Sequence, residues 1–134
     1  PPGAVLPCSS ELPLLLMGGA RDGVIAASSA RYGQAADPVL PLRCTFEQGI
    51  TGQRGDRYLV IWRAANHFTL AHPLDETAGR SFLDSPAEGD ETAIRAHLSE
   101  VIAAFILAVA SRTHSALARL ELLLNTPAVE WCRK

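Results

Sequence analysis

Two short apolar runs constrain the fold of this chain more than any other feature. The first, Pro13 to Met17, is continuous and ends at Gly18-Gly19. The second, Arg57 to Trp62, is rich in β-branched and aromatic residues and stops at Ala64-Ala65. Runs of this length that are bounded by small residues are typical of strands buried on both faces, as parallel strands covered by helices are.

Helical and irregular segments lie between and after these runs. Alanine-rich residues 24–32 precede Gly33, which favours the backbone of a helix end, so we predict a short helix after Asp22. Residues 33–57 carry scattered glycines and prolines without sustained periodicity. They indicate an excursion over the surface, with a turn of helix near residues 46–50.

Two closing helices are predicted within residues 86–125. The segment Ser85 to Glu88 has the layout of a helix start, with a serine cap, a proline and a glutamate that reaches back. An apolar stripe at spacings of three and four follows it and should pack on the sheet: Ile94, Leu98, Val101, Ile102, Phe105, Ile106 and Val109. Thr113 is the expected cap of the last helix, which should end at residues 125–127.

Alternation of apolar strands with helices predicts the α/β class with a parallel sheet. The 134 residues suffice for one compact unit. Two strands are few for such a sheet, which usually has about four to six, so we expect missing strands upstream. The chain opens with Pro1-Pro2-Gly3, without an initiator methionine or a signal pattern, and we expect it to begin inside a longer reading frame or to be processed.

Charge, cysteine content and hydropathy argue against several classes of function. Twelve Lys and Arg stand against fourteen Asp and Glu without a run of like charges, so we expect no nucleic-acid partner. Cys8, Cys44 and Cys132 are widely spaced, which argues against a disulfide framework or a thiolate zinc site and favours a cytoplasmic location. The most apolar run, Val101 to Ala110, is far shorter than the roughly 20 residues that span a bilayer, so no membrane anchor is expected.

Polar side chains follow both predicted strands at the end where open parallel sheets gather catalytic groups. Asp22 follows the first strand in Gly-Gly-Ala-Arg-Asp-Gly, and His67 follows the second in Ala-Ala-Asn-His-Phe. Adjacent parallel strands would bring the two loops side by side. The two residues together are therefore stronger evidence for a catalytic site than either residue alone.

This succession of strand, Gly-Gly, two residues, Asp-Gly, strand, small residues and Asn-His-Phe resembles the end of the α/β-hydrolase fold. The sequence from His67 to Pro73 is similar to that of dienelactone-hydrolase-like and chlorophyllase-like esterases. The resemblance covers residues 1–134 as the C-terminal part of that fold. Its parts are the acid strand and loop (12–23), the surface excursion (33–57), the histidine strand and loop (57–73) and the closing helices (86–125).

The resemblance implies that Asp22 and His67 are the acid and the histidine of a Ser-Asp-His triad. His67 would take the proton from a serine hydroxyl and return it to the leaving alcohol. Asp22 would accept the Nδ1 proton of His67 and stabilise the imidazolium. Asn66 is expected to be only a turn residue, and no cofactor or metal is expected.

The chain departs from the family pattern in one respect, because it lacks the motif that carries the nucleophile. No G-x-S-x-G motif occurs, and none of the nine serines has that setting: Ser9, Ser10, Ser28, Ser29, Ser81, Ser85, Ser99, Ser111 and Ser115. The serine and the donors of its oxyanion hole would lie upstream. The chain alone is therefore expected to be inactive.

Simpler interpretations stand beside the catalytic one. An aspartate after Gly-Gly is often a turn or helix-cap residue, and a lone histidine is often a buried, satisfied one. The glycine-rich loop matches no nucleotide motif, and His72 lies five residues after His67, not the four of a metal-binding helix. His97 and His114 are expected to face solvent, and Asp84 with the acids of residues 88–91 to form a solvated surface.

Two hypotheses of different classes follow. In the first, the chain is the C-terminal segment of a serine hydrolase that cleaves a small-molecule carboxylic ester, completed by the missing N-terminal part of the same fold. In the second, it is a non-catalytic α/β-hydrolase-like binding or assembly module. An uncovered sheet edge would then allow self-association.

Overall fold

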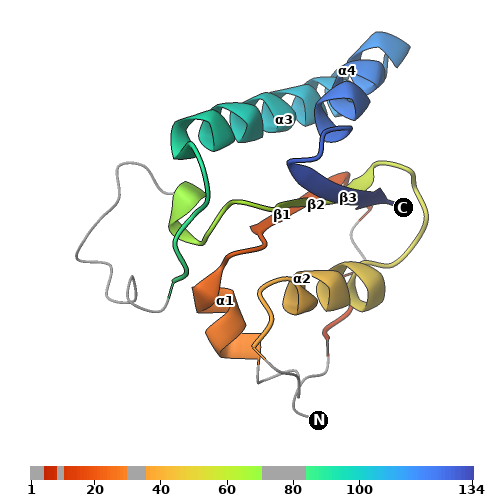
Figure 1. Cartoon of the computed structure of the whole chain (residues 1–134). Helices are drawn as coiled ribbons and strands as arrows, with labels where there is room; N and C mark the ends of the chain where they lie inside the picture. The colour runs from red at the N-terminus through yellow and green to blue at the C-terminus, as the bar shows by residue number, and fades with distance from the viewer. Residues whose placement is uncertain (1–4, 9–10, 30–35, 71–83) are drawn as a thin grey trace.

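A computed structural model describes residues 5–8, 11–29, 36–70 and 84–134, and it contains a three-stranded sheet between two layers of helices (Figure 1). Strand β1 spans Leu14–Gly19, β2 spans Arg57–Trp62 and β3 spans Val129–Arg133, in the order β1-β2-β3. β1 and β2 are parallel, whereas β2 and β3 are antiparallel. The described chain is therefore an α/β mixture built on a small mixed sheet.

The structure confirms both predicted strands and adds one that was not predicted. β2 is the central strand and is buried at each of its six positions. The prediction of a wholly parallel sheet is wrong, because β3 pairs antiparallel with β2 and places Trp131 beside Val60. Packing explains this strand: Trp131 stacks on Tyr58, with ring centroids 6.2 Å apart, and belongs to the larger core cluster.

Short helices lie on one side of the sheet, and those over residues 40–49 pack against it (Figure 1). Helix α1 spans Gly23–Ser28, α2 spans Leu40–Cys44, and α2 runs directly into a π-helical stretch, η2, over Thr45–Gly49. The short helix after Asp22 is confirmed as far as Ser28, and its predicted end at Gly33 lies outside the described residues. The buried residues of this face are Phe46, Ile50, Leu59 and Ile61, with Leu14, Leu16, Ala20, Val39 and Leu42 packed against them.

A helical hairpin covers the opposite face (Figure 1). Helix α3 spans Glu91–Ser111 and α4 spans His114–Leu124. Thr113 caps α4 through the Ala116 amide, and the helix ends before Asn125, as predicted. The core of this face is Tyr58, Val60, Trp62, Ala65, Val101, Ala104, Leu120, Leu124 and Val129.

The predicted start of α3 is wrong. Asp90 caps the helix by accepting from the Thr92 and Ala93 amides. The capping-box segment from Ser85 to Glu88 instead bonds to the histidine loop, where the Ser85 carbonyl accepts from Asn66 Nδ2 at 2.9 Å. Long-range bonds have overridden a local helix signal here.

His97 also departs from its prediction, because it does not simply face solvent. Its Nδ1 accepts from the indole Nε1 of Trp62 at 3.1 Å, and its Nε2 donates to the Leu123 carbonyl at 2.9 Å. The imidazole therefore joins β2, α3 and α4. His114, in contrast, is exposed as expected.

Helix α3 is the one helix in the described parts of the chain that is long and apolar enough to cross a membrane. Core helices pass the same test, and Val101 and Ala104 of α3 are buried against the sheet. On its outer side Ile106 and Leu107 are more than half exposed. Length and composition therefore do not place α3 in a membrane, and the absence of an anchor stays a prediction.

Two leucines of α4 test how the hairpin packs. Leu120 is fully buried, whereas Leu122 is 65% exposed. We expect Leu120→Ala to lower the free energy of unfolding by about 2–5 kcal/mol, because it leaves a cavity beneath the hairpin. The matched Leu122→Ala should change it by less than about 1 kcal/mol. Chemical denaturation measures both, and equal losses would contradict the packing of α4 on the sheet.

Candidate active site

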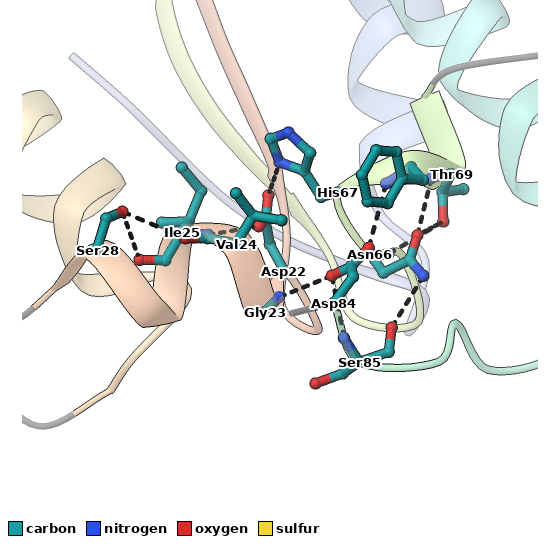
Figure 2. Close-up of polar contacts among 11 residues, drawn as sticks. Asp22, Gly23, Val24, Ile25, Ser28, Asn66, His67, Thr69, Asp84 and Ser85 are labelled. Atoms are coloured by element: carbon teal, nitrogen blue, oxygen red, sulfur yellow. Dashed lines mark hydrogen bonds and ion pairs between the residues drawn. The ribbon is translucent and has the colours of Figure 1, made fainter. Parts of the chain in front are cut away.

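Asp22 lies three residues after the end of β1 and is almost completely buried, at 7% exposure. One carboxylate oxygen, Oδ1, accepts from the Ile25 amide at 2.7 Å and so caps α1 (Figure 2). The helix-cap interpretation of this residue is therefore correct for one oxygen. The other oxygen, Oδ2, is directed at His67.

His67 lies in the loop after β2, directly before the 3₁₀ turn η3, Phe68–Leu70. Its Nδ1 lies 2.9 Å from Asp22 Oδ2 (Figure 2). The side chain is 40% exposed, so it is not a buried core histidine. Because the carboxylate can only accept, this contact places the proton on Nδ1 of the neutral ring and leaves the Nε2 lone pair available.

The parallel pairing of β1 with β2 explains why these two loops meet. Gly19 pairs with Trp62 at the carboxyl ends of the strands. The pairing continues into the loops, where the Ala20 amide donates to the Trp62 carbonyl at 2.9 Å and the Arg21 amide to the Ala65 carbonyl at 3.0 Å. Asp22 is the next residue of one loop, and His67 follows two residues after Ala65 in the other.

Gly19 allows this close approach because it has no side chain. A Cβ atom on Gly19 would overlap the carbonyl oxygen of Ala65, which is backbone and cannot swing away. A Cβ on Gly18 would instead overlap Leu42 Cδ1, the end of a flexible side chain. The two glycines therefore differ, and Gly19 is the one that the site requires.

A second carboxylate, Asp84, lies between the two loops, and the sequence did not identify it. Its Oδ1 accepts from the Gly23 amide at 2.8 Å and from the Ser85 amide at 3.1 Å, and its Oδ2 accepts from the Phe68 amide at 3.3 Å (Figure 2). The prediction that Asp84 belongs to a solvated surface is wrong. No local pattern could have found it, since its partners lie 61 and 16 residues away.

Asn66 closes the turn of the histidine loop, but the expectation that it is only a turn residue is wrong, because its Nδ2 also donates to the Ser85 carbonyl. Its Oδ1 accepts from both the amide and the hydroxyl of Thr69, each at 2.8 Å, while Thr69 Oγ1 accepts from the Asn66 amide. Thr69 is fully buried. This local network holds the backbone on both sides of His67 without touching the imidazole.

Two pockets of the described chain lie away from the Asp22–His67 pair. One, of about 270 Å³, is lined by Tyr58, Phe105 and Leu117, and the other, of about 210 Å³, lies beside Trp62 and His97. Neither is lined by Asp22 or His67. Within the described residues no three histidine, cysteine or acidic side chains gather as a metal site would require.

Comparisons with protein-family models, with curated proteins and with solved structures gave no match. The class of site is consequently defined by geometry alone. It is a histidine–carboxylate pair at the carboxyl ends of two adjacent parallel strands, with one ring nitrogen oriented by the acid and the other unbonded among the described residues.

The two adjacent glycines provide a matched test of the loop contact. We expect Gly19→Ala to lower the free energy of unfolding by about 1–3 kcal/mol, because the added methyl group forces the two loops apart. Gly18→Ala should cost less, since the tip of Leu42 can move. Denaturant titration of both variants measures the difference. Equal losses would show that the loops do not depend on the contact at Gly19.

Proposed function

We propose that this chain is the C-terminal part of an α/β-hydrolase, a serine hydrolase that cleaves a carboxylic ester. Asp22 is the acid and His67 the general base and acid. The observation that carries the proposal is the 2.9 Å contact between Asp22 Oδ2 and His67 Nδ1, made across two adjacent parallel strands with the imidazole half-exposed. The order of acid before histidine also agrees with the family order of serine, acid, histidine.

In this mechanism His67 moves one proton in each direction. Its Nε2 takes the proton from a serine hydroxyl as the oxygen attacks the ester carbonyl, and then gives it to the departing alkoxide, which leaves as the alcohol. The acyl-serine is cleaved by water, with His67 again acting as base and acid. Asp22 stays ionised throughout and stabilises the imidazolium formed in each half-reaction.

The cap of α1 makes Asp22 suitable for this role. Its Oδ1 is held by the Ile25 amide, so rotation of the carboxylate is restricted and Oδ2 stays directed at the imidazole. A preorganised acceptor needs little rearrangement when the charge develops on His67. The side chain is also 10% exposed, which limits competition from water.

The nucleophile is proposed to come from a part of the protein upstream of this chain. No serine of the chain stands in a G-x-S-x-G setting. In the described sheet β1 pairs on one side only, with β2, and Leu14 to Gly18 are only half-buried although β2 is wholly buried. A further strand beside β1 would cover these residues and bring a preceding turn to the same edge as Asp22 and His67.

A second candidate is a non-catalytic module that binds a partner or a second copy of itself. The observation that favours it is the same unpaired edge of β1, since an open strand edge is a template for pairing with another chain. A cytoplasmic location is proposed for either function. The three cysteines are free in the structure, in agreement with a reducing compartment.

Ester hydrolysis by the upstream-extended protein separates these functions. We expect His67→Ala and Asp22→Asn each to lower kcat for a p-nitrophenyl acyl ester by about 10³-fold or more, as loss of a triad member does. Asparagine caps helices as well as aspartate, so Asp22→Asn removes the charge beside His67 and spares α1. The 134-residue chain alone should show no turnover above the rate in buffer.

Matched controls distinguish a catalytic from a structural effect. His114→Ala replaces an exposed histidine, and Asp90→Asn replaces another helix-capping aspartate. Both should keep kcat within about twofold, because neither residue contacts the site. If the His67 and Asp22 variants retained as much activity as these controls, the pair would be structural. Activity absent from every form, together with concentration-dependent self-association, would favour the module.

A further inference from the structure

Residues 84–88 form a clasp that joins the acid loop to the histidine loop. On the acid side, Arg21 Nε donates to the Pro86 carbonyl at 2.6 Å, and Arg21 pairs with Glu88 at 2.5 Å. On the histidine side, the Glu88 amide donates to the Ala64 carbonyl at 2.9 Å, and Asn66 bonds to the Ser85 carbonyl. The clasp is therefore bonded to both loops at the carboxyl end of the sheet.

Asp84 is the member of the clasp closest to the chemistry. The Gly23 amide that it binds belongs to the peptide unit directly after Asp22, and the Phe68 amide belongs to the unit directly after His67. One carboxylate thus accepts from the backbone next to each member of the pair (Figure 2). Its third bond, from the Ser85 amide, fixes the carboxylate on the clasp itself.

Such bonds are well suited to fixing a distance. Hydrogen bonds to an ionised acceptor are roughly twice as strong as neutral ones. The bond from Gly23 is short, at 2.8 Å, whereas the bond from Phe68 is longer, at 3.3 Å. The two loops also meet directly through the Arg21 amide and the Ala65 carbonyl, on the strand side of Asp22 and His67. Asp84 joins them on the far side of both residues, so the pair is held from two directions.

We propose that Asp84 is a positioning residue, whose carboxylate sets the separation and orientation of the Asp22 carboxylate and the His67 imidazole. It touches neither side chain and takes no part in proton transfer. Its catalytic consequence rests on the proposed hydrolase function, whereas its effect on the imidazole does not. A misplacement of about 1 Å in such a pair can cost about 10²-fold in rate.

The kinetic test compares Asp84→Asn with Asp90→Asn in the upstream-extended protein. Asparagine keeps one acceptor oxygen at residue 84 but turns an NH₂ group toward an amide donor, so one link between the loops is lost. We expect kcat to fall about 10-fold to 100-fold with KM within about threefold, because orientation and not substrate binding is changed. Asp90 accepts from two amides of its own helix, and Asp90→Asn should leave both constants unchanged.

A spectroscopic test on the same proteins does not depend on turnover. The Nδ1 proton of His67, held by Asp22, should give a downfield proton resonance that His67→Ala abolishes. We expect this resonance to persist in Asp90→Asn and to be lost to solvent exchange in Asp84→Asn. Asp84→Glu keeps the charge but displaces both oxygens by one methylene group, so it provides a milder variant in which the resonance should weaken and kcat should fall.

The outcomes separate this inference from the proposed function. An unchanged resonance in both Asp84 variants would overturn the positioning role, and so would a kcat loss no larger than that of Asp90→Asn in an active enzyme. If the protein hydrolysed no ester, or His67→Ala kept full activity, the hydrolase proposal would fail. Selective loss of the resonance in Asp84→Asn would even then support Asp84 as the residue that positions the pair.

Discussion

The backbone contact between Gly19 and Ala65 is the constraint on which the rest of the site depends. Two parallel strands can pair along their length and still diverge in the loops that follow. Here the missing side chain of Gly19 lets the amides of Ala20 and Arg21 reach carbonyls of the opposite loop. The strand pairing is thereby extended by Ala20 and Arg21, the two residues that lie between the end of β1 and Asp22.

The carboxylates of Asp22 and Asp84 differ in the hydrogen-bond donors that they bind. Asp22 divides its oxygens between a helix amide and an imidazole, so its charge acts on a group that can change protonation state. Asp84 accepts only from backbone amides in the bonds described, so its charge is used to hold chain segments in place. The same residue type thus contacts a protonatable side chain in one position and only backbone amides in the other.

The structural features that depend on residues close together in the sequence could be predicted from it. The strands β1 and β2 follow from short apolar runs bounded by small residues, and the Thr113 cap follows from its position before an apolar repeat. The approach of Asp22 to His67 follows from the parallel arrangement that such strands favour. In each case a local signal and the general geometry of parallel sheets were sufficient.

Features that depend on distant partners were not predictable in this way. Strand β3 is short and mixes Glu130 with Trp131, so it becomes recognisable only when it lies against β2. The Ser85 to Glu88 segment carries a helix signal, yet its bonds to the two loops prevail over it. Asp84 could not be identified locally, because the two partners that place it between the loops, Gly23 and Phe68, lie 61 and 16 residues away.

We propose that Asp22 and His67 activate a serine supplied by the upstream part of the protein. Labelling with a fluorophosphonate tests it most directly, because a serine oxygen displaces fluoride from this reagent only when a base takes its proton. We expect stoichiometric labelling of the upstream-extended protein at a serine outside residues 1–134, and its loss in His67→Ala. Undiminished labelling in His67→Ala, or labelling of a serine within this chain, would contradict it.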